Sequence, residues 1–368
     1  MTELITGTDL VAWQLDVAAG LPLPLTQDAI RLTGHAIEVR LYAEDPANQF
    51  MPQTGPIAHW VPASGPGIRI DGGIQEGQSV TPFYDSMLAK VIAYGANREE
   101  ARRRLCRALN HSTLFGVKVN SHFLHNLVAH PVFAEGGATT AFIQEHFQAD
   151  VSMKATEATP LSSALVAVAL YRNGFQSSSL LTLSNWRSAN RAPWPYELRL
   201  GEQVIELSLN AAEHQYIIEQ EDQSRVELSV VAETPLNSRG LREMQYVQNG
   251  VRRACRYALN QERIYLQLDG RYYEYADLTH EAAVSESEGG SGRIVASMDG
   301  SIIDVSVEVG QRVTKGQTLL TLEAMKMEHP LKADRDGVVQ EVLVAAGTQV
   351  KIRQLLVALE SESEEEGK

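Results

Sequence analysis

Cysteine is scarce in this 368-residue sequence, which has only Cys106 and Cys255. Two distant cysteines in no metal-like spacing exclude a disulfide scaffold and predict reduced thiols in a reducing compartment. No apolar run reaches the ~18 residues that a membrane-spanning helix needs. The start, Met1 to Gly7, lacks the charged and apolar regions of a signal peptide. We therefore expect a soluble, cytoplasmic protein with no membrane partner and no bound metal.

Excess positive charge is also missing, because the formal net charge is -14. Such a chain is not expected to bind nucleic acid or anionic membranes. The one basic cluster follows Asn97, a good helix cap, and Glu100 stands at the capping-box position. We interpret the cluster as a solvated helix face rather than an anion site; its members are Arg102, Arg103, Arg104 and Arg107. No glycine-rich phosphate loop is present either, since Gly65-Pro66-Gly67 is short and interrupted by proline.

What is present indicates a multidomain α+β protein with four parts. Residues 1–148 mix helix and strand patterns, with a helix over 8–20, a strand over 36–42 and two helices within 97–130. A stretch rich in Thr, Ser and Ala then opens a second part, residues 149–288. A Gly- and Ser-rich linker at 283–292 leads into a third part, residues 289–360. An acidic tail, residues 361–368, is expected to be disordered.

The second part contains one strongly apolar helix, Leu161 to Tyr171, which Asn173-Gly174 is expected to end. A helix that is apolar on nearly every face should be buried on most sides. Short alternating runs follow, two of them joined by the hairpin turns Asn249-Gly250 and Asp269-Gly270. The pattern predicts an antiparallel β-barrel around the helix. The runs are Tyr196–Leu200, Val204–Leu209, Gln215–Gln220, Val226–Val231, Met244–Gln248, Arg252–Leu259, Ile264–Leu268 and Arg271–Tyr275.

The third part repeats itself at an interval of 37 residues, as Asp299-Gly300 and Asp336-Gly337 show. Two strand–turn–strand halves of equal length predict a flattened β-sandwich with a pseudo-twofold axis. The turn between the halves holds Ala324-Met325-Lys326-Met327. A lysine at a hairpin tip is exposed and has a long flexible stem, so its amine could attack an activated acyl group. The alternative is an ordinary turn lysine between two core methionines.

This part resembles the biotinyl domains of biotin-dependent carboxylases, whose mark is Ala-Met-Lys-Met. The resemblance implies covalent biotin on Lys326, flanked by Met325 and Met327. A lipoyl domain has the same architecture, but its lysine is usually flanked by Asp and Ala. One departure is Ser297-Met298-Asp299-Gly300, where the family often has Pro-Met-Pro-Gly; it affects a turn and not the lysine.

The first part resembles the C-terminal part of a biotin carboxylase. The matching stretches are residues 2–10, Gly34-His35-Ala36-Ile37-Glu38-Val39-Arg40, Ala43-Glu44-Asp45-Pro46, Gly65-Pro66-Gly67-Ile68-Arg69 and Tyr84-Asp85-Ser86-Met87. The resemblance implies that Arg40 faces the ureido ring of biotin and bicarbonate, where a guanidinium stabilises developing negative charge. From alternation alone, Arg40 would instead be a strand-face salt bridge to Glu38 or Glu44. Arg69 matches a family arginine associated with contact between two carboxylase copies.

The ATP-grasp part of the carboxylase finds no match, so we expect a fragment or a truncated reading frame that is inactive alone. Residues 149–288 resemble, more weakly, the segment of acyl-CoA carboxylase α subunits that docks the carboxyltransferase β subunit. Among these, 3-methylcrotonyl-CoA carboxylase, an enzyme of leucine catabolism, looks nearest, with geranyl- and propionyl-CoA carboxylases open.

The resemblance implies a bacterial parent enzyme that uses ATP, Mg and bicarbonate, a biotin protein ligase as partner, and an acyl-CoA bound on the β subunit. The alternative hypothesis is a non-catalytic biotin carrier and assembly module.

Overall fold

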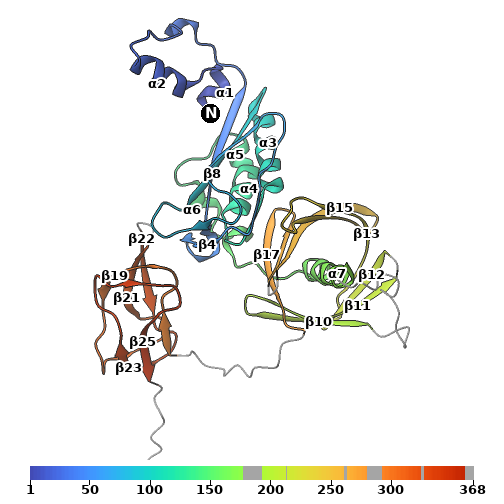
Figure 1. The fold of residues 1–368 in the computed structure, drawn as a ribbon, viewed down its shortest axis with the longest axis vertical. Coiled ribbons are helices and arrows are strands. Elements are labelled where there is room, and N and C mark those ends of the chain that lie inside the picture. Colours follow the sequence, from blue (N-terminus) through green and yellow to red (C-terminus); the bar gives the residue numbers. More distant parts are fainter. Residues whose placement is uncertain (177–192, 213, 261–262, 280–291, 325–326, 361–368) are drawn as a thin grey trace, which may run out of the picture. The chain divides into compact units, whose positions relative to one another are not determined.

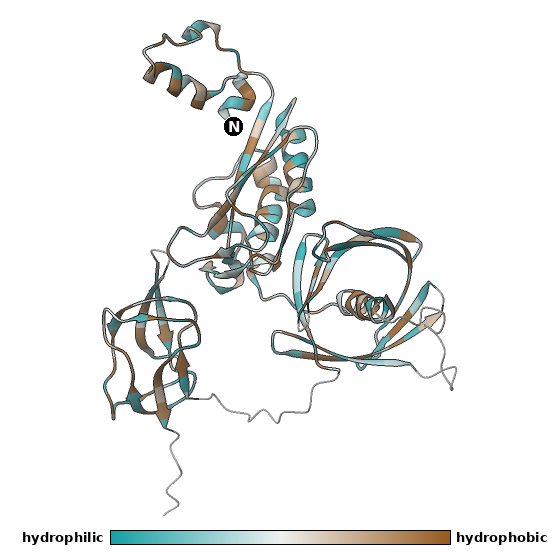
Figure 2. Ribbon diagram, viewed as in Figure 1, coloured by the Kyte–Doolittle hydropathy of each residue, from teal (hydrophilic) through white to brown (hydrophobic). Residues whose placement is uncertain are grey.

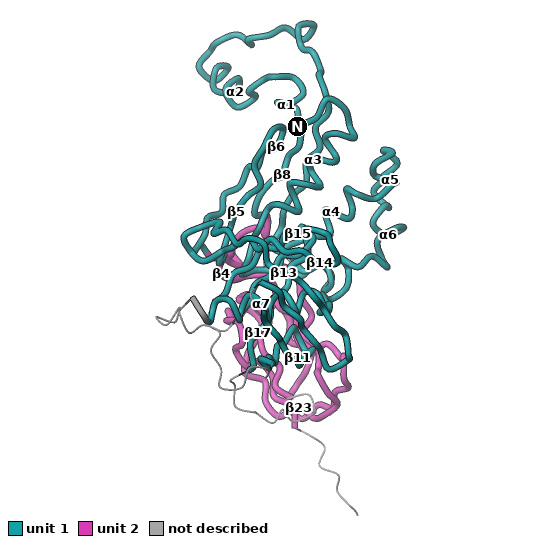
Figure 3. The backbone as a smooth tube through the Cα atoms, turned by 90° about the vertical axis from the view of Figure 1, so that its right-hand side faces the viewer, with its two compact units in different colours: residues 1–51, 57–78, 88–282 teal, residues 52–56, 79–87, 283–368 magenta. Residues whose placement is uncertain are grey.

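The computed structural model describes residues 1–176, 193–212, 214–260, 263–279, 292–324 and 327–360. The described parts of residues 1–51, 57–78 and 88–282 form one compact unit (Figure 3). Those of residues 52–56, 79–87 and 283–368 form the other. The first unit holds the barrel and most of the N-terminal α+β segment. The second holds the C-terminal sandwich and residues 52–56 and 79–87 of that segment.

The N-terminal segment is built on a three-stranded sheet in the order β1-β8-β6, packed against helices α3 and α4 (Figure 1). Its longer elements are α1 Thr2–Thr6, α2 Leu10–Ala18, β1 His35–Tyr42, β6 Ile68–Gly72, β8 Met87–Gly95, α3 Arg98–His111, α4 Ser121–Ala129, α5 Pro131–Ala134 and α6 Phe142–His146. Short strands and turns complete it: β2 Glu44–Asp45, β3 Met51–Pro52, β4 Gly55–Pro56, β5 His59–Val61, β7 Ser79–Val80, β9 Thr113–Phe115, and the 3-10 turns η1 Gln27–Ala29, η2 Pro46–Asn48 and η3 Val151–Met153.

Helix α3 begins where the capping pattern predicts. The Asn97 side chain accepts from the Glu100 amide at 2.9 Å, and the Glu100 carboxylate accepts from the Ala96 amide at 2.8 Å. These bonds satisfy amides that lack partners in the first helical turn. The basic cluster is a helix face: Arg102 pairs with Glu99 at 2.7 Å and Arg104 with Glu100 at 2.7 Å.

Eight antiparallel strands close into a barrel in sequence order (Figure 1). They are β10 Trp194–Leu200, β11 Gln203–Ala212, β12 Gln215–Gln220, β13 Arg225–Pro235, β14 Arg242–Gln248, β15 Val251–Asn260, β16 Arg263–Leu268 and β17 Arg271–Asp277. Each predicted run is one of these strands. The two predicted hairpin turns have positive φ at both central residues, 50° and 75° at Asn249-Gly250 and 50° and 76° at Asp269-Gly270. That geometry matches the twist of paired strands.

Helix α7, Pro160–Gln176, lies inside the barrel, and Figure 2 shows its hydrophobic colouring within the ring of strands. Its described side chains from Ser162 to Ala169 are at most 1% exposed. Pro160 suits the first helical position, and before it Thr159 and Ser162 exchange bonds of 2.9 and 3.1 Å between amides and hydroxyls. The predicted end at Asn173-Gly174 is wrong. Gly174 lacks the positive φ of a helix-ending glycine, and packing outweighs the ~1 kcal/mol propensity cost of a helical glycine.

The C-terminal sandwich consists of two four-stranded sheets, β18-β25-β23-β20 and β22-β21-β19-β24. Its strands are β18 Arg293–Val295, β19 Gly300–Val305, β20 Arg312–Val313, β21 Thr318–Ala324, β22 Met327–Lys332, β23 Gly337–Val342, β24 Gln349–Val350 and β25 Leu355–Glu360. Strands β19, β20 and the start of β21 recur 37 residues later as β23, β24 and β25. The flattened β-sandwich is therefore confirmed.

Hydrogen bonds repeat at the same interval. The Asp299 carboxylate accepts from the Ile352 amide at 2.6 Å, and the Asp336 carboxylate accepts from the Lys315 amide at 2.6 Å. Each aspartate closes a turn of the opposite half. The pseudo-twofold relation therefore extends from the strands to individual side chains.

Candidate functional sites: the carrier hairpin and the Arg40 strand

The hairpin at the centre of the repeat is formed by β21 and β22. Their register runs from Thr318 paired with Lys332 to Ala324 paired with Met327. Met325 and Lys326 stand between these strands in the sequence and lie outside the described residues. Of the three predicted cofactor-binding residues, Met327 is therefore described, as the first residue of β22. Ala324 and Met327 form the last pair of the hairpin, and the two residues between them in the sequence connect its strands.

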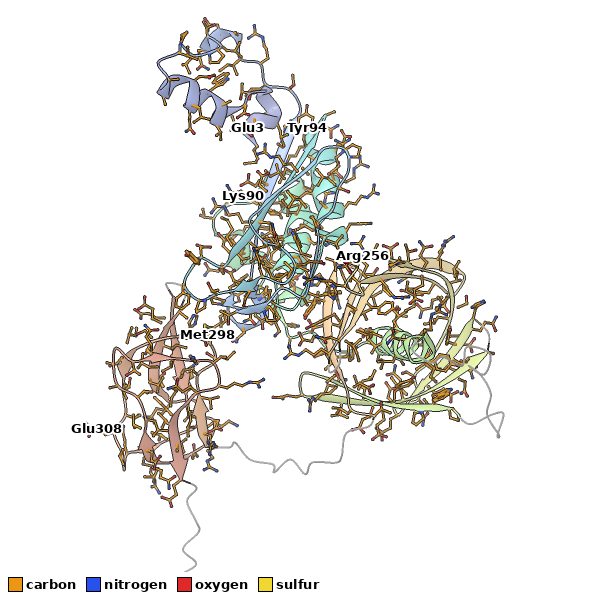
Figure 4. All side chains as sticks on the ribbon, viewed as in Figure 1. Glu3, Lys90, Tyr94, Arg256, Met298 and Glu308 are labelled. Atoms are coloured by element: carbon orange, nitrogen blue, oxygen red, sulfur yellow. The ribbon has the colours of Figure 1, made fainter. Side chains whose placement is uncertain are left out.

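The base of this hairpin is tightly packed. A Cβ atom at Gly300 would lie 2.5 Å from the Glu323 carbonyl oxygen, so only glycine fits beside β21. Met298, labelled in Figure 4, is 3% exposed. Asp299, in the turn beside Gly300, accepts a hydrogen bond from the Ile352 amide at 2.6 Å and so ties this turn to the opposite half of the sandwich. The departure from Pro-Met-Pro-Gly leaves the hairpin intact.

Arg40 lies on β1, where burial alternates. Ile37 and Leu41 are buried against the helices, and Arg40 is exposed on the opposite face. Strand β1 is the last strand of its sheet, so among the described strands none pairs with one edge of its backbone. At that edge the Tyr42 amide donates to the side-chain oxygen of Asn120 at 3.0 Å. Arg40 lies in the first unit and the β21–β22 hairpin in the second.

Arg69 is bound within its own chain. Its guanidinium donates to Glu3 at 2.6 Å and to Asp71 at 2.8 Å. Hydrogen bonding to Asp71 and then to Glu3 raises the pKa of Arg69. The arrangement joins helix α1 to strand β6. A role for Arg69 between two carboxylase copies stays a prediction.

Residues that the sequence did not predict join the barrel to the N-terminal segment. Gln267, 9% exposed on β16, accepts from the Thr113 hydroxyl at 2.5 Å and donates to the Ser112 carbonyl at 2.9 Å. Arg256 of β15, labelled in Figure 4, donates to the His111 carbonyl at 2.5 Å. An apolar cluster lies beside them, made of Phe115, Leu241, Ala258 and Tyr265. The periodicity of the sequence does not predict such pairs, because the partners are about 150 residues apart in sequence.

Two family descriptions match the chain. Residues 38–145 match the biotin carboxylase C-terminal domain, and residues 291–359 match the biotin-requiring enzyme domain. The first match contains the Arg40 strand and the second contains the β21–β22 hairpin. The chain therefore contains one region similar to the C-terminal domain of biotin carboxylases and a second region similar to the domain of biotin-requiring enzymes.

Similar proteins include α subunits of acyl-CoA carboxylases. The chain is 32% identical to the α subunit of methylcrotonoyl-CoA carboxylase of Mus musculus, over 98% of this chain and 52% of that protein. It is 30% identical to the α chain of propionyl-CoA carboxylase of Ruegeria pomeroyi, over 98% of this chain and 56% of that protein. A 148-residue stretch is 51% identical to the biotin carboxylase of Halalkalibacterium halodurans, covering 40% of this chain and 32% of that protein. The chain is homologous to acyl-CoA carboxylase α subunits and spans about half the length of those it matches.

The described residues lack two further features. They contain no group of three or more His, Cys, Asp or Glu side chains arranged to hold a metal ion. Within the same residues, no helix has the length and apolar character needed to cross a membrane.

Proposed function

We propose that this chain carries carboxyl groups on biotin attached to Lys326. Biotin would be carboxylated with ATP and bicarbonate at a site that includes Arg40. The loaded carrier would then deliver the carboxyl group to an acyl-CoA on a carboxyltransferase β subunit. The observation that carries the proposal is Ala-Met-Lys-Met at the β21–β22 hairpin of a domain matching biotin-requiring enzymes.

The hairpin suits attachment of biotin. The lysine amine would attack the carbonyl of an activated biotinyl group, forming an amide as the activating group leaves. A biotin protein ligase has to reach that amine, and on the neighbouring strand Glu328 is exposed. The packed base formed by Gly300 and Ala324 would hold the hairpin in one conformation for the ligase.

Arg40 is proposed to stabilise negative charge on the biotin ureido group as carboxylation begins. Its exposed position on β1 leaves the guanidinium accessible from one side, while Ile37 and Leu41 anchor the strand. A guanidinium keeps its charge at all working pH values and can form two parallel hydrogen bonds. A fixed positive charge of this kind acts mainly on the transition state.

The barrel is proposed as the docking element for the β subunit. Its eight strands form a closed barrel around α7. Gln267 and Arg256 bond this barrel to the N-terminal segment. A rigid element fixed to the carboxylase part could hold a partner subunit at a constant position. The alternative, a barrel that only spaces the biotinyl domain, predicts no β-subunit binding by the barrel.

For the acyl-CoA, we propose 3-methylcrotonyl-CoA, supported by the resemblance to methylcrotonoyl-CoA carboxylase α subunits. Propionyl-CoA is the second candidate substrate, because the chain is also similar to a propionyl-CoA carboxylase α chain. The non-catalytic carrier and assembly module remains the rival function. An ATPase assay with free biotin and bicarbonate, on a carboxylase that includes the ATP-binding part, separates the two, because Arg40→Ala should lower biotin-dependent ATP hydrolysis only if this chain takes part in catalysis. A cytoplasmic location remains a prediction.

The central test is the attachment site. In cells with an active biotin ligase, we expect intact mass spectrometry to show one biotin on the wild-type chain and none on Lys326→Ala. Lys332→Ala, an exposed lysine on β22, is the matched control and should keep its biotin. An unmodified wild type, or biotin on Lys326→Ala, would refute the assignment.

A further inference from the structure

Asn120 makes three hydrogen bonds to the free edge of the strand that bears Arg40. Its backbone amide donates to the Tyr42 carbonyl at 3.2 Å, and its side-chain oxygen accepts from the Tyr42 amide at 3.0 Å. Its side-chain amide donates to the Arg40 carbonyl at 3.4 Å. Asn120 is 4% exposed, so water does not compete for these groups. One residue thus takes the place of a neighbouring strand at Arg40 and Tyr42.

These bonds are made instead of a helix cap. Asn120 precedes helix α4, and asparagine at that position usually accepts from an amide of the first turn. Here the side chain makes no such bond, while the Asn120 carbonyl accepts from the Leu124 amide at 2.9 Å in the first helical turn. Because the Asn120 side chain makes no capping bond, both its oxygen and its amide group are available for the hydrogen bonds to β1. Helix α4, buried through Phe123, Leu124 and Val128, holds it there.

The segment leading to Asn120 is held by the barrel at its other end. Residues 110–120, which we call the connecting segment, include the backbone carbonyls of Ser112 and His111 that accept from Gln267 and Arg256. Within the segment, Phe115 stacks on Tyr265 of the barrel with ring centroids 5.4 Å apart. The connecting segment therefore touches the barrel at one end and the Arg40 strand at the other.

We infer that Asn120 is a positioning residue for Arg40, and that the connecting segment couples the Arg40 strand to the barrel. The part of this inference that concerns reaction rate rests on the proposed role of Arg40. Asn120 itself touches no substrate. It fixes the backbone from which the guanidinium extends, and the barrel in turn limits how far Asn120 can move.

Amide hydrogen exchange on the whole chain tests the coupling without any assay of catalysis. In Asn120→Ala the Tyr42 amide loses its acceptor and should exchange about fivefold to tenfold faster, the effect of one net hydrogen bond. Asn120→Asp keeps an acceptor oxygen and should retain most of the protection. Asn126→Ala, which removes an asparagine of α4 bonded to Asp150, is the control and should leave Tyr42 unchanged.

A barrel variant tests the other end. Gln267→Ala should speed exchange in residues 110–116 and, to a smaller extent, at Tyr42, whereas Gln215→Ala on the exposed barrel wall should do neither. If Tyr42 keeps wild-type protection in Asn120→Ala, the positioning role is wrong. If Gln267→Ala loosens residues 110–116 and leaves Tyr42 untouched, the coupling is wrong.

Rate measurements need a carboxylase that includes the ATP-binding part, with free biotin as substrate. There Arg40→Ala should lower kcat about 10²–10³-fold, and Asn120→Ala about tenfold through misplacement, with the KM for ATP unchanged in both. The double variant should be no slower than Arg40→Ala alone, because Asn120 acts through Arg40. Multiplying losses would overturn the positioning role. An unchanged rate in Arg40→Ala would instead remove the proposed role of Arg40, and the exchange results would still decide whether Asn120 holds the strand.

Discussion

His122, near the start of α4, shows how burial changes the charge of a single residue. Removal from water lowers its pKa to about 4, and the charges of Arg271 and His125 act in the same direction. Asp150 opposes them without reversing the shift. The imidazole is therefore neutral in the folded protein at any pH above about 4. In an unfolded chain it would bind a proton near the ordinary value of about 6.5.

This difference predicts a loss of stability in mild acid. Between pH 6.5 and pH 4 the unfolded chain binds a proton at His122 that the folded chain does not, so the free energy of unfolding falls as pH falls through that window. Urea unfolding at several pH values should show a weaker dependence in His122→Gln than in wild type. His35→Gln, which removes an exposed histidine, should retain the wild-type dependence. A His122→Gln curve parallel to wild type would show that this site does not titrate as described.

At the residue scale, the sequence predicted features that depend on nearby residues in the chain. Lys326 is marked by its flanking methionines and by the repeat, and the Asn97 cap by the glutamate three residues later. Asn120 also precedes a helix, but no glutamate stands three residues later, and its side chain bonds to a strand nearly 80 residues away. The local sequence does not predict those bonds, because only the folded sheet creates the strand edge that Asn120 fills.

Helix α7 is the element on which the barrel core depends. Leu165 is fully buried among the barrel side chains, so Leu165→Asp would place an unpaired carboxylate there. Such a charge costs several kcal/mol, and we expect the barrel to lose its cooperative melting transition. Val204→Asp is the control, since Val204 is 51% exposed on the outer wall and should change stability by less than ~0.5 kcal/mol. Unchanged melting of Leu165→Asp would mean that the helix is not the core of the barrel.

The far end of α7 is held by a buried carboxylate. Glu233, with its side chain 6% exposed on β13, accepts from Arg172 of the helix at 3.2 Å and lies 3.6 Å from Arg242. Tyr257 also donates to it. The helix is thereby bonded to the barrel wall as well as packed within it.

Glu233→Ala should therefore lower the free energy of unfolding by about 3 kcal/mol, the low end for a broken buried ion pair, because it leaves two partly buried arginine charges without their partner. Glu227→Ala removes a carboxylate that is 62% exposed and paired with Arg225 on the same strand, and should cost ~1 kcal/mol or less. Chemical denaturation monitored by tryptophan fluorescence measures both. Equal costs for the two variants would show that burial of Glu233 adds nothing.

At the element scale, the alternating runs predicted all eight barrel strands because most have one face in the core and one toward solvent. Strand β16 is buried on both faces, since its outer face packs on the N-terminal segment. Register was also accessible at Asn249-Gly250 and Asp269-Gly270, where the turn type fixes it. The end of α7 was not predicted correctly, because the barrel packed around the helix keeps Gly174 helical. The bulge between Val230 and Ala232 likewise has no local signal.

At the scale of the whole molecule, the barrel has one face turned to its own chain. Leu241 and Ala258 are at most 1% exposed there, packed with Phe115. A barrel cut out alone, as residues 149–288, would expose this face. Tests of partner binding should therefore retain the N-terminal segment.

We expect a chain shortened to residues 1–288 to co-purify with the cognate β subunit as well as the whole chain does. Residues 289–368 alone should become biotinylated but should not retain the β subunit. Size-exclusion chromatography of the mixtures measures both. Retention of the β subunit by residues 289–368, with none by residues 1–288, would assign docking to the biotinyl domain instead. The boundaries 148/149 and 288/289 used in this design remain predictions.

The pseudo-twofold axis of the sandwich has a mechanical consequence. In the repeat, the end of β21 and the start of β22 correspond to the end of β25 and the region where β18 begins, with Arg293 paired to Ala358. A twofold operation exchanges opposite poles, so the chain enters at one pole and the hairpin stands at the other, about 20 Å away for strands of six residues. A rotation of this domain about its first described residues would therefore move the hairpin by a distance comparable to the length of the sandwich. Biotin on Lys326, as proposed above, would be moved further still.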